Sequence, residues 1–105
     1  MIIRLVRMHF SPETSEKFLA IFDEMNRHIR SFEGCRGLEL YREVDDAHSF
    51  ATYSFWDSLE HLEAYRQSEL FKSTWAKVKP LMRSKPTAVS YERVYPQDDV
   101  GHPTR

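Results

Sequence analysis

A histidine and a tyrosine four residues apart stand among aromatic residues in the middle of this sequence. His61 and Tyr65 have the spacing that puts two side chains on one side of a helix. Trp56 precedes them and Trp75 follows them. An imidazole or a phenol beside aromatic rings can handle the proton of a bound flat aromatic molecule, while the rings hold it and exclude water. We therefore expect this segment to form the wall of any pocket.

The proposed wall for a flat aromatic substrate consists of four aromatic side chains: Trp56, Tyr65, Phe71 and Trp75. Either His61 or His9, which lies in the first predicted strand, would handle the substrate proton. The alternative interpretation is that rings at helical spacing belong to the core, and that His61 lies in solvent beside Glu60 and Glu63. The sequence leaves both interpretations open.

No metal or cofactor is predicted. Asp45, Asp46 and His48 could suggest a metal site, but turns favour aspartate for their own reasons, so a turn is the preferred interpretation. Cys35 is the single cysteine, which excludes a CxxC motif and a disulfide within the chain and favours a small buried filler. No phosphate-binding loop or dinucleotide motif occurs among the three glycines.

Hydrophobic periodicity and capping residues predict an alternation of strands and helices. The predicted strands cover residues 2–10, 35–44, 49–56 and 87–95. A first helix is predicted from Ser11 to Gly34, and a second helical run from an Asp57 cap to Pro80, with a break at Ser68-Glu69. Arg4 and Arg7 fall on opposite faces of the first strand. Both are expected near a rim, with one of them facing a polar pocket as the alternative.

The order of these elements is β-α-β-β-α-β, which predicts an α+β, ferredoxin-like fold. In this fold a four-stranded antiparallel sheet carries its helices on one face. The first and third strands are apolar on both faces, so the uncovered face needs a partner. A second copy of the chain is the economical partner, and we expect a homodimer packed sheet to sheet.

Composition limits the class of protein. The chain of 105 residues fits one domain, here residues 1–95, followed by a polar tail at residues 96–105. The formal net charge of −1, with basic residues scattered among acidic ones, argues against nucleic-acid binding. The N-terminus is too short and too charged for a membrane segment, and a cytoplasmic location is expected.

Three segments in this order resemble the antibiotic biosynthesis monooxygenase (ABM) family, whose members are small dimeric α+β barrels. They are residues 32–37 (FEGCRG), 54–58 (SFWDS) and 65–71 (YRQSELF). The resemblance extends to about Tyr95. It implies that function lies among cofactor-free oxygenases of phenolic compounds, quinol monooxygenases, haem degraders and small proteins without an assigned role.

The family pattern separates these functions. The haem degraders of the family have an Asn in the first strand and a His after the helix break. In this chain the first strand has no Asn, and Trp75 stands at the position of the His, so the resemblance argues against haem degradation. The oxygenases of phenolic polyketides in this family have a Trp at the end of the third strand and an Asn four residues earlier. This chain matches the Trp with Trp56 but has Thr52 at the position of the Asn. The resemblance thus implies a cofactor-free monooxygenase that acts with O2 on a small phenol or quinol. A non-catalytic dimeric small-molecule binder or stress-linked module is the alternative.

Overall fold

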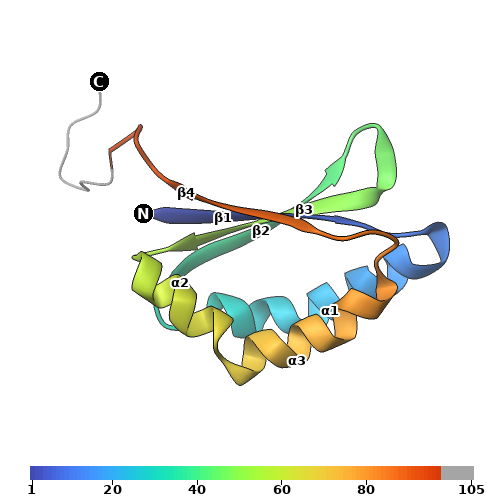
Figure 1. Cartoon of the computed structure of the whole chain (residues 1–105), viewed down its shortest axis with the longest axis horizontal. Coiled ribbons are helices and arrows are strands. Elements are labelled where there is room, and N and C mark those ends of the chain that lie inside the picture. The colour runs from blue at the N-terminus through green and yellow to red at the C-terminus, as the bar shows by residue number, and fades with distance from the viewer. Residues whose placement is uncertain (98–105) are drawn as a thin grey trace.

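The computed structural model describes residues 1–97 and has the predicted ferredoxin-like arrangement. Four strands form one antiparallel sheet in the order β2-β3-β1-β4, and all three α-helices lie on one face of it (Figure 1). The elements are β1 (Ile2–His9), α1 (Pro12–Arg30), β2 (Cys35–Glu43), β3 (Asp46–Trp56), α2 (Leu59–Arg66), α3 (Glu69–Val78), a 3-10 turn η1 (Lys79–Leu81) and β4 (Thr87–Glu92).

Serine caps begin the helices. Ser11 precedes Pro12 at the start of α1, as predicted, and its backbone N–H donates to Thr14 Oγ1 at 3.1 Å. The Ser68 hydroxyl accepts from the backbone N–H of Phe71 at 3.1 Å and starts α3, which confirms the predicted break between two helices.

The cap of α2 differs from the prediction. Ser58, not Asp57, accepts from the backbone N–H of His61, at 3.2 Å. Asp57 instead accepts from Arg36 Nε at 2.6 Å. The Asp57 carboxylate is therefore used by an ion pair that ties β2 to the start of α2, and the shorter serine hydroxyl one residue later provides the cap.

Two strand boundaries also differ by three residues from the prediction. β3 begins at Asp46 rather than Ser49, because the chain turns at Val44-Asp45. β4 ends at Glu92 rather than Tyr95. Residues 98–105, most of the predicted polar tail, lie outside the described residues.

Aromatic side chains of α1, of β3 and of the residue that follows β1 form the core at one end of the sheet. Phe10 stacks on Phe18 with ring centroids 4.5 Å apart, and Phe50 lies 5.4 Å from Phe18. All three are at least 97% buried. Each buried side chain of this size stabilises the fold by roughly 1.5–3 kcal/mol, which holds α1 against the sheet.

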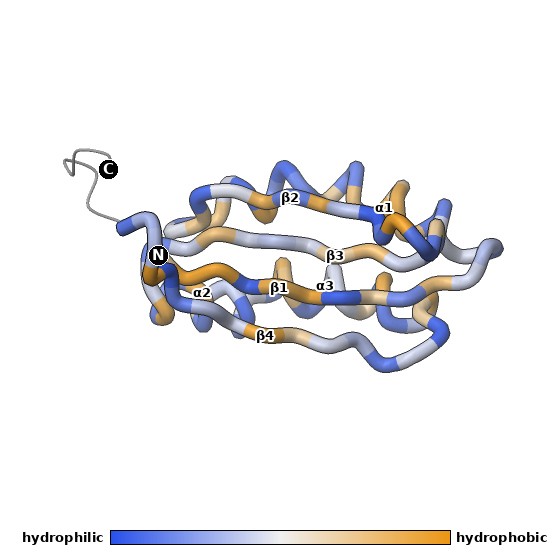
Figure 2. The backbone as a smooth tube through the Cα atoms, turned by 90° about the horizontal axis from the view of Figure 1, so that it is seen from above, coloured by the Kyte–Doolittle hydropathy of each residue, from blue (hydrophilic) through white to orange (hydrophobic). Residues whose placement is uncertain are grey.

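Within residues 1–97, no helix lies over the opposite face of the sheet (Figure 2). Apolar side chains on this face remain substantially exposed: Tyr41 at 50%, Val89 at 44% and Tyr91 at 50%. Tyr41 contacts Tyr53 of the neighbouring strand, with ring centroids 5.3 Å apart. Among residues 1–97, no helix has the length and hydropathy needed to span a bilayer.

Candidate functional site

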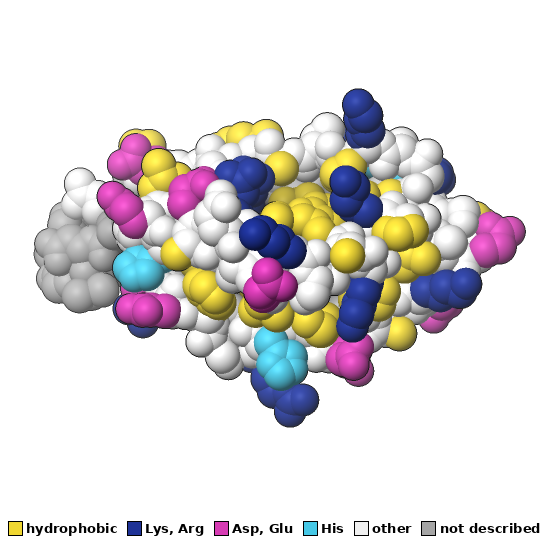
Figure 3. Space-filling view, turned by 60° about the horizontal axis from the view of Figure 1, so that its bottom comes forward, with side chains coloured by type: hydrophobic (Ala, Val, Ile, Leu, Met, Phe, Trp, Pro, Cys, Tyr) yellow, Lys and Arg dark blue, Asp and Glu magenta, His cyan; other side chains and the backbone are white. Residues whose placement is uncertain are grey.

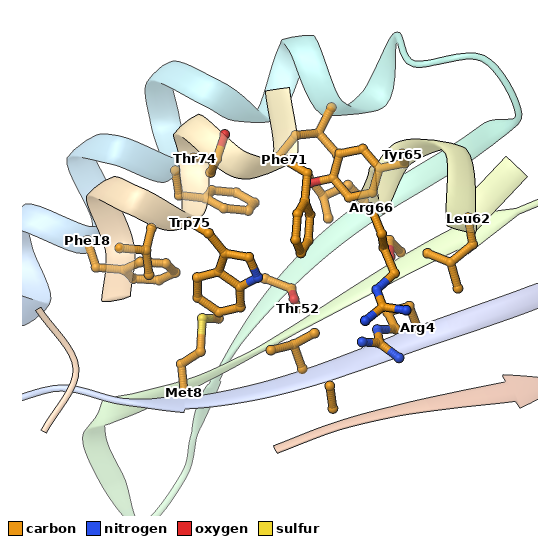
Figure 4. Close-up of a pocket in the computed structure, with 17 residues that line it drawn as sticks. Arg4, Met8, Phe18, Thr52, Leu62, Tyr65, Arg66, Phe71, Thr74 and Trp75 are labelled. Atoms are coloured by element: carbon orange, nitrogen blue, oxygen red, sulfur yellow. The ribbon is translucent and has the colours of Figure 1, made fainter. Parts of the chain in front are cut away.

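A cavity of about 120 Å³ lies between the sheet and the three helices (Figure 4). Its lining is mostly apolar and aromatic, with a few hydroxyl groups and two arginines. On the helix side of the molecule, a hollow with hydrophobic atoms at its bottom has Lys and Arg side chains around it (Figure 3). The arrangement has the properties of a small-molecule site: concave, apolar and carrying a small number of polar groups.

Short side chains on the sheet leave room for the cavity. The strand register places Ser54 and Ser90 on either side of Arg4, and Thr52 and Ala88 on either side of Val6. Leucines, phenylalanines or other long residues at these positions would fill the space below the helices. The volume of the cavity is thus set by two neighbouring rows of residues across the sheet.

The four aromatic residues singled out from the sequence contact one another in order. The rings of Trp56 and Tyr65 stack with centroids 5.0 Å apart, Tyr65 meets Phe71 at 5.2 Å, and Phe71 meets Trp75 at 6.1 Å. Tyr65, Phe71 and Trp75 line the cavity, as does Thr52. Their role in binding substrate stays a prediction, but the convergence of the rings is a property of the fold.

Trp56 lies behind this wall rather than on it. Its side chain is fully buried, its ring Nε1 donates to the Ser54 hydroxyl at 2.9 Å, and it is not among the residues that line the cavity. Trp56 therefore supports the ring of Tyr65 from the side of the sheet. Its predicted contact with substrate would require Tyr65 to move.

The phenol of Tyr65 stays protonated at neutral pH. Burial raises the pKa of its hydroxyl to about 12. A neutral phenol donates a hydrogen bond, and it cannot accept a proton as a phenolate would. Within the cavity, Tyr65 is suited to hold an oxygen of a bound molecule.

Neither predicted histidine lines the cavity. His61, at the start of α2, has its Nδ1 2.8 Å from the Ser58 hydroxyl, and its ring packs over Gly34, which precedes β2. His9 belongs to β1, but its side chain lies on the face opposite to Arg4, Val6 and Met8, which do line the cavity. Its Nδ1 is 2.6 Å from the Ser49 hydroxyl.

Two arginines were not among the predicted site residues. Arg4 and Arg66 both line the cavity, whereas Arg7 is exposed and pairs with Glu43 at 2.7 Å. Arg4 therefore faces a cavity, as in the alternative considered from the sequence, while its hydrogen bond to Ser90 is exposed, so a position at the rim is not contradicted. The sequence signal for Arg4 was a charged residue among the apolar residues on one face of the first strand. Arg66 had no comparable signal, because charged residues are common on the surface of a helix.

No group of three or more His, Cys, Asp or Glu side chains that could hold a metal ion occurs within residues 1–97. Asp46 and His48 instead form turn and strand hydrogen bonds: Asp46 Oδ1 accepts from the His48 backbone N–H at 3.0 Å. Burial raises the pKa of the Cys35 thiol, which disfavours the nucleophilic thiolate.

The fold and the cavity define a ferredoxin-like α+β protein with an aromatic-walled internal binding site. The sequence profile of the antibiotic biosynthesis monooxygenase family matches residues 1–77, and the chain belongs to this family. No curated protein matches the sequence.

Solved structures of low sequence identity share the fold. An antibiotic biosynthesis monooxygenase has a TM-score of 0.82 at 19% identity, with 90% of this chain and 99% of that chain covered. A protein from Mycobacterium tuberculosis has a TM-score of 0.81 at 20% identity, with 89% and 94% covered. A conserved protein from Methanosarcina mazei has a TM-score of 0.82 at 18% identity, with 89% and 93% covered.

Proposed function

We propose that this protein is a cofactor-independent monooxygenase that oxidises a small phenol or quinol with O2. The observation that carries the proposal is the cavity, walled by Tyr65, Phe71 and Trp75, in a chain of the ABM family. An apolar cavity of about 150 Å³ takes up benzene. The 120 Å³ found here is close to that volume, which limits a bound substrate to a single ring.

The reaction needs no external reductant. A phenol with a free ring C–H para to its hydroxyl, together with O2, gives a quinone and water. The substrate loses four electrons and two hydrogens, one oxygen atom of O2 becomes the new carbonyl, and the other leaves as water. A quinol reacts in the same way to give a hydroxyquinone.

In this proposal the chain binds the ring, excludes water and orients the reacting oxygen. The substrate loses its phenolic proton to water before the ring is enclosed, and Tyr65 donates a hydrogen bond to the phenolate oxygen, which stabilises the form that reacts with O2. Thr52 faces the same space from the sheet. The proposed substrate contacts are thus Thr52, Tyr65, Phe71 and Trp75, with Trp56 behind Tyr65.

Oxygen consumption tests the proposal. The purified protein is incubated with monocyclic quinols and phenols in air and in ¹⁸O₂, and uptake is compared with buffer alone. One ¹⁸O atom per product molecule and a loss of rate in Tyr65→Phe support the monooxygenase. Uptake that never exceeds the buffer rate across the panel contradicts it.

Single alanine variants test the predicted proton-handling roles of His61 and His9. Their positions outside the cavity lining give neither a direct contact with a bound ring. Turnover that persists in His61→Ala and His9→Ala removes both residues from the mechanism. A loss of turnover with unchanged thermal stability would retain the affected histidine.

A second candidate function is non-catalytic binding of a small aromatic molecule. The observation that favours it is that, among the described residues, no histidine, cysteine or carboxylate lines the cavity. Such a site lacks the usual general bases near neutral pH. Saturable binding of a quinol without any oxygen consumption would identify this function.

We also propose that the uncovered sheet face pairs with the same face of a second copy. The support is its apolar, half-exposed surface, which includes Val89 and Tyr91, and the position of all three helices on the other side. Sedimentation at micromolar concentration should give a dimer. Val89→Lys should yield monomer, while Val44→Lys at the hairpin tip serves as the control; a monomeric parent chain contradicts the proposal.

A further inference from the structure

Two guanidinium groups meet at one end of the cavity. Arg4 from β1 and Arg66 from the end of α2 point toward one another in Figure 4. They are the charged residues among those described that line the cavity, and no carboxylate lines it with them. Like charges that face each other in a partly buried site repel unless an anion lies between them.

The hydrogen bonds of this pair leave donors unused. Arg66 Nη1 donates to Glu63 Oε2 at 2.9 Å on the outer side of α2, while its Nε is buried and has no partner within the described residues. Arg4 Nη1 donates to the Ser90 hydroxyl at 2.9 Å. A buried donor without an acceptor is unfavourable, so this arrangement favours an acceptor supplied from outside the chain.

The electrostatics of Arg4 agree with the geometry. Burial lowers the pKa of Arg4, and the charge of Arg66 lowers it further, while Glu63 acts in the opposite direction. Glu63 bonds to Arg66 alone and leaves the second cation without a carboxylate partner. An anion placed between the two groups would offset their repulsion and stabilise the charged form of Arg4.

We infer that Arg4 and Arg66 form a carboxylate-binding subsite at the end of the aromatic cavity, whose ligand is a single-ring aromatic acid. A planar carboxylate has two oxygens, one for each guanidinium group, and the guanidinium fork matches this geometry. A phenolate has one oxygen, which both guanidinium groups would have to share. The ring of the ligand would then lie against Phe71 and Tyr65.

This inference rests on the proposed function, because it takes the occupant of the same cavity to be the substrate. It narrows that substrate to an aromatic ring carrying both a carboxylate and a hydroxyl group. The hydroxyl end would face Tyr65 and Thr52, and the carboxylate end would face the arginines.

Calorimetric titration without oxygen tests the subsite separately from turnover. Benzoate and benzamide have the same shape, but only benzoate is charged. We expect benzoate to bind at least about tenfold more tightly, the ratio typical of a charge-assisted hydrogen bond. The matched variants are Arg66→Gln and Arg4→Gln, which should each abolish the preference, and Arg36→Gln, which should retain it because Arg36 lies outside the cavity lining and pairs with Asp57.

The outcomes separate the two proposals. Equal binding of benzoate and benzamide by the parent chain, or an unchanged ratio in both cavity variants, overturns the subsite even if phenols consume oxygen. A clear benzoate preference with no oxygen uptake from hydroxybenzoates supports the subsite and contradicts the monooxygenase. Arg66→Lys keeps the positive charge but lacks the forked guanidinium group, and we expect it to retain part of the preference for benzoate. A thermal unfolding curve like that of the parent chain confirms that this variant is folded.

Discussion

The ring of Tyr65 stacks on the fully buried ring of Trp56, with centroids 5.0 Å apart and an interplanar angle of 27°. This contact joins α2 to the end of β3, and it fixes the position of the one phenol in the cavity. Tyr65, which lines the cavity, is thus held in place by Trp56, which does not line it.

Removing the Trp56 ring should lower the stability of the fold and also release the Tyr65 ring from its position. Trp56→Ala is expected to lower the free energy of unfolding by about 3–5 kcal/mol, the usual cost of deleting a buried large aromatic ring. Trp75→Ala should cost less, because Trp75 is only partly buried and borders the cavity. Urea unfolding measures both variants, and equal losses would contradict the distinction between a supporting ring and a lining ring.

Gly34 should not tolerate a side chain. Its φ is +87°, and a Cβ atom there would clash with Cγ of His61. Gly34→Ala is therefore expected to destabilise the chain by more than about 1 kcal/mol. Gly37→Ala is the control, since its added Cβ would meet Phe55 at 3.3 Å and no positive φ is involved. Thermal unfolding should rank the Gly34 variant well below the Gly37 variant.

Asp46 should make stability depend on pH in acid. The pKa of its carboxyl is lowered from 3.8 to about 2, first by the Ser49 hydroxyl, then by the His48 backbone N–H and by Arg83. Because the folded pKa lies below the unfolded one, the contribution is complete above the unfolded pKa and is lost as pH falls toward 2. The difference in stability between the parent chain and Asp46→Asn should shrink from pH 5 to pH 2. Denaturant unfolding across this range would contradict the assignment if the difference stayed constant.

The size of the cavity should depend on Thr52. Thr52→Val and Thr52→Leu both remove the hydroxyl, but only leucine adds volume to a space of about 120 Å³. We expect the leucine variant to bind an aromatic ligand at least about tenfold more weakly than the valine variant, because the added methylene occupies the ligand volume. Similar affinities in the two variants would show that the ring does not reach Thr52.

Much of the fold followed from local signals in the sequence. Ser11 with Pro12 and Ser68 with Glu69 marked helix starts because capping depends on hydrogen bonds within a few residues. Runs of β-branched, aromatic and other apolar residues marked β1 and β3. Asp57, however, pairs with Arg36 of β2, and Ser58 provides the cap instead. That pairing joins two segments distant in sequence, so no local pattern could reveal it.

The sequence by itself determined the element order, the family and the aromatic cluster of α2 and α3, since these depend on residue type and short spacing. Only the tertiary structure decided which face of the sheet the helices cover, because β1 is apolar on both faces and alternation alone does not choose between them. That choice turned His9 away from the cavity and turned Arg4 into it. It also brought Arg66 of α2 over β1, so the charge of the site was settled by packing between elements and not by any motif.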